Sequence, residues 1–410
     1  MGTTACHTQL PRATIANISF LCSSYHDTRS ISHLSTPLSR GARRIRSRPV
    51  GAAPVRFDNT PSDAALRPER FIASMYGVGY DEGESGHERS RLMTMTPNLS
   101  SNYFELKVVS DGVYAAIAKR GTGAVGNAGI IDLGEETVVF DTMYTPQAAQ
   151  ELRRAAEQLW GRPVSYVINS HFHFDHVGGN QAFAHAAIIS TAKTRELMLE
   201  RGNQLISYAK SHPDYPEQVR TSLERETDAN RQKEMADHLG DVLALAADLP
   251  VITLTPAALL FDRSLTLQGS KRRAVLMTKG CGHTPCDSIL YLPEDEIVFT
   301  GDLLSVNTHP HIRDGNAQEW VRILEEIETL ALRDAVPGHG PVGGKEDLAV
   351  FRAYLTMLLD RAVQLATAKI PLETIPYSDI PEMYAGWQVP SLYANNLKHL
   401  CEQFSAAERR

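Results

Sequence analysis

Apolar residues occur along much of this chain in short runs that turn-forming residues separate. The runs are rich in Val, Ile, Leu and Ala, and Gly, Asp, Thr or Pro residues stand at their ends. A run of about four to eight such residues between turn signals is typical of a β-strand. The predicted strands lie at residues 112–118, 127–134, 137–143 and 164–170, and then at 251–257, 264–269, 273–280, 288–292 and 296–301.

A helical pattern interrupts the first strands at TPQAAQELRRAAEQLWG, which begins at Thr145. Thr145 is a favourable N-cap residue, Pro146 suits the first helical position, and Gly161 suits the end of a helix. Further helices are expected near 317–330 and 345–369. Strands and helices that follow one another in this way predict an α/β layered domain.

The domain organisation follows from changes in composition along the chain. Between about 191 and 249 the sequence becomes charged and helix-favouring, which predicts a helical insertion within a domain at 101–370. The insertion could pack on one face of the domain or cover its substrate. Residues 371–410 are mixed in character and are expected to form a C-terminal extension packed on the domain. Residues 1–100 are polar and without hydrophobic periodicity, so a disordered or targeting region is predicted.

Charge is distributed unevenly between the amino-terminal segment and the rest of the chain. Residues 1–56 contain eight arginines, no lysine and one acidic residue, which gives them seven excess positive charges. Because the whole chain carries a net charge of −7, residues 57–410 carry −14. An acidic body disfavours a nucleic-acid groove, since such grooves attract phosphates with clustered Lys and Arg. The basic segment resembles an organellar transit peptide, with a disordered tail as the alternative.

Cysteine content and hydropathy limit the cellular setting. The five cysteines, an odd and sparse set, argue against a disulfide framework and favour a reducing compartment. No stretch reaches the roughly eighteen apolar residues of a membrane span. We therefore predict a cytoplasmic protein, or an organellar one if residues 1–56 are a transit peptide. The expected partner is a small-molecule substrate, with neither nucleic acid nor membrane.

The segment HFHFDHVGGN, which follows the predicted strand at 164–170, is dense in metal-binding residue types. In an extended segment, residues i and i+2 point to the same side, so His171 and His173 can converge on one ion. Asp175 and His176 come one turn later and face a neighbouring position. One segment can thus contribute ligands to two adjacent metal ions.

Two metal sites need more ligands than one loop supplies, because zinc takes about four and a catalytic ion keeps one position for water. Three distant residues have a suitable context: His283 in CGHTPCDS, Asp302 in VFTGDLL and His339 in VPGHG. Each lies near a predicted strand and beside glycine, where layered α/β proteins carry their site residues. Asp141, at the end of TVVFD, has a similar context.

These residues, in this order, resemble the metallo-β-lactamase fold superfamily over approximately residues 105–365. The resemblance implies an αββα sandwich, with two sheets flanked by helices and a dinuclear site at one edge. It implies His171, His173 and His283 on the first metal, Asp175, His176 and His339 on the second, and Asp302 bridging both. It also implies that Asp141 orients the histidine loop, a general role of outer carboxylates at metal sites.

The chemistry expected of such a site is hydrolysis. Histidine and carboxylate ligands without thiolate favour two zinc ions, with Mn, Fe or Co as alternatives. A water that bridges two metal ions becomes hydroxide near neutral pH and attacks the substrate. Asp175 is the expected catalytic residue, orienting this nucleophile and then passing a proton to the leaving group. The predicted substrate is a small-molecule ester, thioester, lactone or lactam.

Several alternatives remain at this level. True β-lactamases of the superfamily usually carry Cys or Ser where Asp302 stands, so the wider group of thioesterases and lactonases is favoured over a β-lactamase proper. In CGHTPCDS, Cys286 and Asp287 replace the Gly and His of the GHTPGH form, which disfavours a strict glyoxalase II. An iron-dependent sulfur dioxygenase on the same fold is a further alternative, and a non-enzymatic protein would be expected to have lost ligands.

Four other residues lie near the predicted ligands. Cys281 and Cys286 bracket His283, and reduced, partly buried thiols are favoured over a redox or metal role. His309 and His311 stand near the expected mouth of the site, where a plain loop role is favoured over substrate contact.

Overall fold

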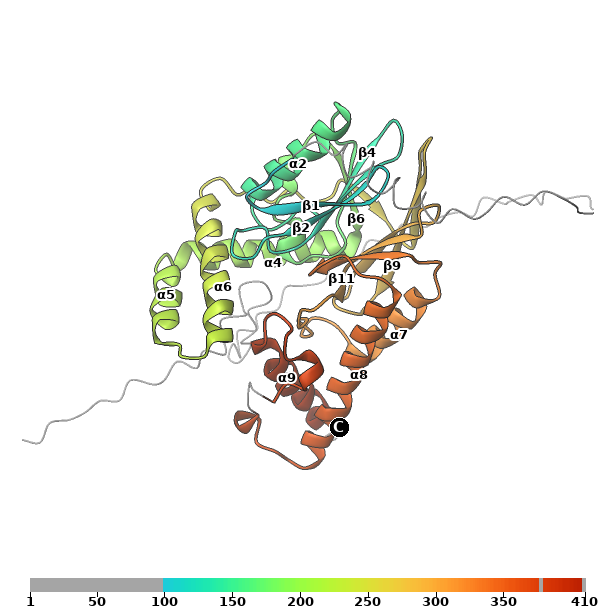
Figure 1. Ribbon diagram of the computed structural model, residues 1–410. Coiled ribbons are helices and arrows are strands. Elements are labelled where there is room, and N and C mark those ends of the chain that lie inside the picture. Colours follow the sequence, from blue (N-terminus) through green and yellow to red (C-terminus); the bar gives the residue numbers. More distant parts are fainter. Residues whose placement is uncertain (1–98, 376–378, 408–410) are drawn as a thin grey trace, which may run out of the picture. The chain divides into compact units, whose positions relative to one another are not determined.

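Two β-sheets are stacked face to face in this computed structural model, which describes residues 99–375 and 379–407 (Figure 1). The predicted disordered or targeting region lies outside the described residues, except for its last two positions. The first sheet has the order β1-β2-β3-β4-β5-β6-β7 and the second the order β12-β11-β10-β9-β8. The strands of the first sheet are β1 Phe104–Ser110, β2 Val113–Ala118, β3 Ala128–Asp132, β4 Thr137–Phe140, β5 Tyr166–Ile168, β6 Ala187–Thr191 and β7 Leu259–Phe261. Those of the second sheet are β8 Ser264–Gln268, β9 Arg273–Gly280, β10 Asp287–Leu292, β11 Ile297–Ser305 and β12 Asp334–His339.

The direction of the strands changes partway through each sheet. Strands β1 to β4 form an antiparallel meander, whereas β4, β5, β6 and β7 run parallel. In the second sheet β8 to β11 are antiparallel, and β12 is parallel to β11. Parallel neighbours need a crossover connection, which α2 (Pro146–Trp160) supplies between β4 and β5, and α7 (Ala317–Glu328) between β11 and β12.

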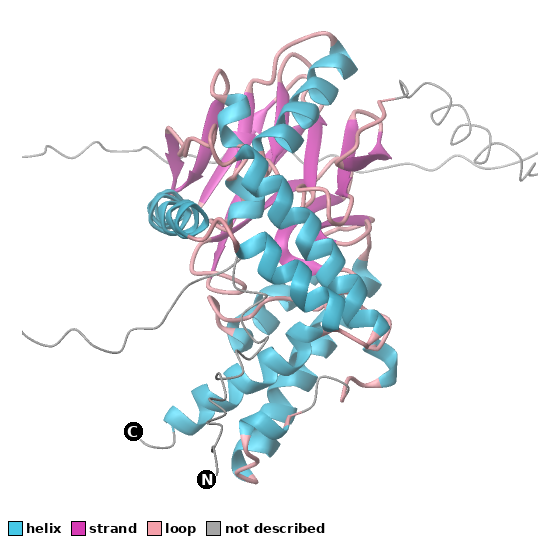
Figure 2. Ribbon diagram, turned by 90° about the vertical axis from the view of Figure 1, so that its left-hand side faces the viewer, coloured by secondary structure: helices cyan, strands magenta, loops and turns pink. Residues whose placement is uncertain are grey.

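Three apolar clusters define the layers. One lies between α2 and the first sheet, a second between the two sheets, and a third between the second sheet, α7, α8 (Lys345–Thr367) and α9 (Ser391–Ala407). Alternation along the strands produces this arrangement: Ile130 belongs to the first cluster and its neighbour Ile131 to the second. The fold is an αββα sandwich, as the sequence predicts, and Figure 2 shows its helices packed against the strands.

Helix α2 follows the local signals in the sequence. The Thr145 hydroxyl accepts a hydrogen bond from Ala148 N, Pro146 is the first helical residue, and Gly161 ends the helix with a φ of 64°. A positive φ at this position is readily adopted by glycine, which has no Cβ to clash. The predicted helix is therefore confirmed to the residue.

The segment 191–249 contains three helices: α4 (Ala192–Ser211), α5 (Tyr215–Arg225) and α6 (Ala229–Asp248). After α8, the chain passes through short 3-10 turns at Leu372–Thr374 and Glu382–Tyr384 to α9, which packs along α8 (Figure 1). None of the helices in the described part of the chain is both long and apolar enough to cross a membrane.

One strand prediction is wrong, and four strands of the structure, β1, β6, β7 and β12, are missing from the predicted set. Residues 251–257 form an irregular connection, in which Val251 is exposed and Thr253 N donates to the Gln181 side chain. In the described part of the chain these residues pair with no neighbouring strand, and strand β7 begins only at Leu259. The unpredicted β1 is an edge strand whose exposed Glu105 weakens the apolar pattern. The unpredicted β6, AIIST, is too short a run to stand out in the sequence.

Candidate metal centre

The seven predicted ligands come from both sheets and meet at one edge of the sandwich. His171 follows β5, His173 is the N-cap of the short helix α3 (Phe174–Val177), and Asp175 and His176 lie within α3. The second sheet contributes the other three, His283 after β9, Asp302 from within β11 and His339 at the end of β12. Asp302 was expected past its strand, but β11 continues beyond it with an irregular register at Gly301.

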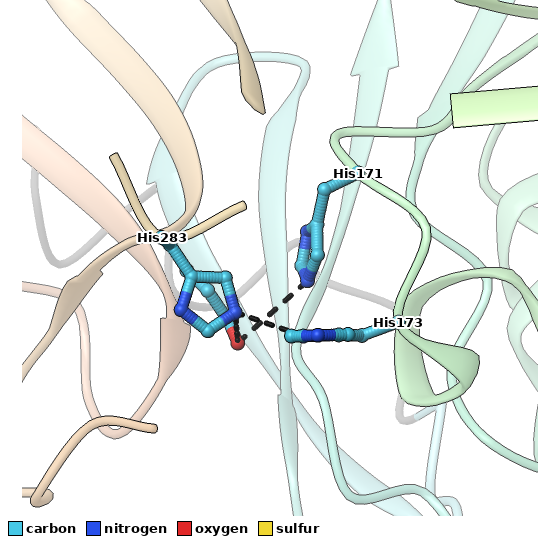
Figure 3. A group of neighbouring side chains, drawn as sticks. His171, His173 and His283 are labelled. Atoms are coloured by element: carbon cyan, nitrogen blue, oxygen red, sulfur yellow. Dashed lines mark hydrogen bonds and ion pairs between the residues drawn. The ribbon is translucent and has the colours of Figure 1, made fainter. Parts of the chain in front are cut away.

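A first group of donor atoms belongs to His171, His173, His283 and Asp302, which are all buried. One ligand atom from each lies within 4.8 Å of the others. The His283 Nε2 is 2.8 Å from His173 Nδ1 and 3.2 Å from Asp302 Oδ2. Figure 3 shows the rings of His171 and His173, which come from one segment, turned toward the ring of His283, which comes from another. This group has the size and donor types of a single metal site.

A second group consists of Asp175, His176 and His339. The Asp175 Oδ2 lies 3.4 Å from His176 Nε2 and 3.3 Å from His339 Nε2. His339 is the only partly exposed member, since the other two are buried. The three residues that the resemblance assigns to each metal therefore lie together in one of the two groups, and their binding of metal stays a prediction.

Asp302 lies between the two groups. Its Oδ2 faces the first group, 3.2 Å from His283 Nε2 and 3.8 Å from His171 Nε2. Its Oδ1 faces the second, 3.0 Å from His176 Nε2 and 3.3 Å from His339 Nε2. A carboxylate with one oxygen toward each group has the placement that a bridging ligand requires.

Several donor atoms of the two groups are placed to bind a metal ion and not to form hydrogen bonds with one another. Among the described residues, His171 Nε2, His176 Nε2 and Asp302 Oδ1 are buried and make no hydrogen bond, although they lie close together. Buried polar atoms without partners are costly and rare in folded proteins. Ligand atoms of a metal site lie close together without hydrogen bonds, because their lone pairs all point at the position of the ion. The arrangement of these three atoms therefore suits divalent cations.

The electrostatics favour the metal-binding forms of His171 and Asp302, whereas at His176, His283 and His339 the nearby carboxylates outweigh burial and raise the pKa. Burial lowers the pKa of His171 well below its usual value, which keeps that imidazole neutral. Burial alone would raise the pKa of Asp302, but His339, His176 and His283 beside it hold this pKa well below the ordinary range. Neutral imidazole and ionised carboxylate are the forms that bind metals.

Asp141 holds the histidine loop in place. Its carboxylate accepts hydrogen bonds from Ser170 N and Ser170 Oγ at 2.7 Å, and lies 2.9 Å from His176 Nδ1. The backbone of Asp141 has a φ of 60°, a conformation that aspartate tolerates better than most residues. The contact with the outer nitrogen of His176 is consistent with the orienting role expected from the sequence.

Two further contacts to ligand histidines were not predicted. Asp314 Oδ2 lies 3.0 Å from His173 Nε2, and the backbone oxygen of His311 lies 2.9 Å from His283 Nδ1. Burial would raise the pKa of Asp314, but His173, His311 and His283 together hold this pKa well below the ordinary range, so the carboxylate is ionised. The only sequence signal for Asp314 is its place in the loop after Asp302, where an aspartate before glycine looks like an ordinary turn residue.

Asp287 shapes the turn that carries His283. Its carboxylate accepts hydrogen bonds at 3.0 Å from Gly282 N and Thr284 N, the residues on either side of His283. Burial raises the pKa of Asp287 to about 6. Asp287, which replaces the second histidine of the GHTPGH form, thus provides a buried acceptor that holds the turn around His283.

The two nearby cysteines are free thiols. Cys281 is exposed, whereas Cys286 is buried and burial raises its pKa to about 11. A thiol with a raised pKa is a poor nucleophile and a poor metal ligand. Neither belongs to a metal-binding group of the described residues. Cys286 is buried, whereas Cys281 is more exposed than the expected partly buried thiol.

A cavity of about 350 Å³ opens onto the two groups. Its lining includes five of the seven predicted ligands, namely His173, Asp175, His283, Asp302 and His339. His309 also lines it, but its Nδ1 lies 2.7 Å from Tyr354 Oη, as for a packed core histidine. Asn127 lines it as well, and its amide bonds the backbone of Pro337 and Gly340, which fixes the approach to His339.

The insertion helix α6 forms part of the cavity wall. Glu234, Asp237, His238 and Asp241 lie on one face of α6 at helical spacing and line the cavity. Two of the acids have partners from other segments, Asp237 with Arg120 Nε at 2.6 Å and Glu234 with Ser391. The insertion therefore contributes to the wall of the cavity. The sequence alone did not decide whether the insertion packs on a face of the domain or covers the substrate.

Comparison with known proteins gives a family for this arrangement. The family described as the metallo-beta-lactamase superfamily matches residues 121–339, a range that contains all seven predicted ligands and Asp141. The chain is also similar to the linear primary-alkylsulfatase of Pseudomonas sp. (strain ATCC 19151), with 22% identity over 296 residues, which cover 67% of this chain and 54% of that protein. The chain thus spans about half the length of this curated relative.

The solved structures that are similar to this chain include three metallo-beta-lactamases. A metallo-beta-lactamase from Pontibacter korlensis has 17% identity and a TM-score of 0.46, covering 62% of this chain and 99% of that one. One from Hirschia baltica has 18% identity and a TM-score of 0.44, covering 62% and 98%. The metallo-beta-lactamase FIM-1 from Pseudomonas aeruginosa, in its mono-zinc form, has 17% identity and a TM-score of 0.45, covering 66% and 97%.

Proposed function

This chain belongs to the metallo-beta-lactamase superfamily, and on that premise we propose that it is a metal-dependent hydrolase of a small-molecule ester, thioester, lactone or lactam. The observation that carries the proposal is the convergence of seven donor residues in two groups at one cavity of about 350 Å³. A cavity of this size suits a small molecule rather than a polymer.

The proposed cofactor is a pair of divalent ions, with zinc as the first choice. His171, His173 and His283 would hold one ion, Asp175, His176 and His339 the other, and Asp302 would contact both. Imidazole and carboxylate ligands without thiolate suit zinc, and also Mn, Fe or Co. When bound, such ions supply an activated water and positive charge for the oxyanion that develops during hydrolysis.

The protein's own groups provide orientation and proton transfer. Asp175 lines the cavity, and burial, which would raise its pKa, is outweighed by His176 and His339, so the pKa lies well below the ordinary value. An ionised carboxylate here accepts a hydrogen bond from the attacking water and can then deliver the proton to the leaving group. Asp314 and Asp141 keep His173 and His176 in their orientations.

The test measures metal content and turnover on the same preparation. Protein of known metal content is offered a phenyl acetate, an acyl thioester, a γ-lactone and a β-lactam. We expect about two ions per chain, turnover of at least one substrate, and loss of that turnover after chelation and in His173→Ala. Turnover that persists without metal would contradict the proposal, as would an intact, metal-loaded protein that hydrolyses none of the four classes.

A sulfate ester is the second candidate substrate. The supporting observation is the similarity to the linear primary-alkylsulfatase, whose name describes a hydrolase of alkyl sulfates. Release of sulfate from a primary alkyl sulfate, measured beside the carboxylic ester, separates the two candidates. Turnover of the carboxylic ester alone would remove the sulfatase candidate.

A further inference from the structure

The C-terminal extension completes the wall of the cavity. Gln388, Val389 and Leu392 line it together with the ligand residues, although they lie about fifty residues beyond the range that matches the family. Gln388 and Val389 belong to the segment that leads into α9, and Leu392 lies in the first turn of α9, a region where the sequence alone indicates no chemistry. This part of the cavity is therefore supplied by an element outside the family-matched range.

The backbone of Val389 is strained. Its φ is 57°, in the left-handed region, where a β-branched side chain clashes with its own backbone. It also precedes Pro390, and a residue before proline is normally restricted to extended conformations. Strain of this kind persists only where surrounding contacts hold it, and it is concentrated at functional sites.

Hydrogen bonds on both sides of Val389 hold this conformation. Before it, Gln388 N donates to Asn307 O at 2.8 Å and Gln388 O accepts from His309 N at 3.0 Å. After it, Leu392 N donates to Val389 O at 3.0 Å as the chain enters α9. The segment is thus tied to the loop that follows Asp302 on one side and to a helix start on the other.

Glycine would adopt this backbone without strain, so the presence of valine needs a reason in its side chain. Val389 is only half-buried, and it joins none of the apolar clusters formed by the described residues. Val125, which also lines the cavity and has a φ of 61°, differs because it packs against Tyr144 and its neighbours. The Val389 side chain is therefore available to whatever fills the cavity.

We propose that Val389 is a specificity-determining residue whose isopropyl group contacts an apolar part of the substrate. This inference rests on the proposed ester hydrolysis and narrows its substrate class to esters with an apolar acyl or alkyl group. Leu392 lines the same wall and extends the apolar contact. Transfer of such a group from water to an apolar wall provides the selectivity.

The test follows the dependence of kcat/KM on acyl length. The substrates are p-nitrophenyl acetate, butyrate, hexanoate and octanoate, and the proteins are metal-loaded wild type, Val389→Thr, Val389→Ala and Val389→Gly. Threonine keeps the branched shape of valine but has a hydroxyl in place of one methyl group. We expect wild type to prefer the longer esters, and the octanoate-to-acetate ratio to fall about tenfold in Val389→Thr, mainly through KM. Val389→Gly should lose the same preference while its melting temperature is no lower than that of wild type.

Lys369→Gly is the matched control, because Lys369 also has a positive φ, of 51°, but is exposed and outside the cavity lining. It should keep the length preference of wild type. An unchanged octanoate-to-acetate ratio in both Val389→Thr and Val389→Ala would overturn the inference while leaving ester hydrolysis intact. Absence of ester turnover in wild type would instead contradict the proposed function itself.

Discussion

The outer ring nitrogen of His173 lies 3.0 Å from a carboxylate oxygen of Asp314, 141 residues further along the chain. The inner nitrogen of the same ring, Nδ1, faces His283 within the first donor group. A carboxylate on the outer nitrogen fixes the orientation of an imidazole and makes it a stronger ligand. Asp314 would therefore act on a bound metal ion through His173.

Replacement of Asp314 should weaken metal binding without unfolding the protein. We expect Asp314→Ala to raise the metal dissociation constant by roughly 10- to 100-fold, and Asp314→Asn to have a smaller effect because an acceptor remains. Competition with a chelator measures this constant directly. Asp262→Asn, at an exposed position, serves as the control. Equal affinity in Asp314→Ala and wild type would show that the contact does not support the site.

Asp302 should affect both donor groups, whereas His339 should affect only one. Each carboxylate oxygen of Asp302 faces a different group, so Asp302→Ala removes a donor from both. Calorimetric titration of metal into the metal-free protein is expected to show weakened binding in two phases for Asp302→Ala, and in one phase for His339→Ala. If Asp302→Ala and His339→Ala both lost the same single binding phase, that result would argue against a bridging position for Asp302.

Asp141 supports the fold as well as the site. Asp141→Ala leaves the buried Ser170 N–H without its acceptor, removes one of the two partners of the Ser170 hydroxyl, and places alanine at a φ of 60°. The expected loss in the free energy of unfolding is about 3 kcal/mol. Asn at position 141 keeps an acceptor and tolerates this backbone, so for Asp141→Asn the expected loss in the free energy of unfolding is about 1 kcal/mol. Urea unfolding of the metal-free proteins measures both values, and similar losses would contradict this explanation.

His238 on α6 should make stability depend on pH. Burial lowers the pKa of His238 to about 4, from the usual 6.5. The unfolded chain therefore binds a proton that the folded chain rejects, and stability is lost as the pH falls from 6.5 toward 4. Between pH 8 and pH 5 this contribution amounts to about 2 kcal/mol.

The variant His238→Gln lacks this proton-binding difference. Its deficit in unfolding free energy relative to wild type, measured in urea, should be larger at pH 8 than at pH 5. A constant deficit across this pH range would show that the imidazole titrates normally in the folded protein.

Predictions from the sequence succeeded where the signal is local. Helix α2 is bounded as predicted because Thr145, Pro146 and Gly161 act through their own backbone and nearest turns. The run at 251–257 has a similar apolar character but fails as a strand, since a strand also needs a partner and none lies beside it. Local chemistry specifies a cap, whereas sheet pairing depends on distant segments.

The same distinction applies to the site. The family and its αββα fold follow from the order of HFHFDHVGGN, His283, Asp302 and His339, because few other arrangements use these residue types at these places. Asp314 and Val389 carry no comparable signal. An aspartate before glycine and a valine before proline are ordinary in sequence, and only their surroundings make them notable.

The sequence by itself determined the residue types available for metal binding and, through apolar periodicity, the layers that present them. Only the tertiary structure decided that each oxygen of Asp302 faces a different group and that the insertion helix and C-terminal extension share the cavity wall. The physical reason is that ligation and cavity shape depend on distances between segments far apart in the chain. Periodicity reports which side of an element is buried, but not which distant side chain it meets there.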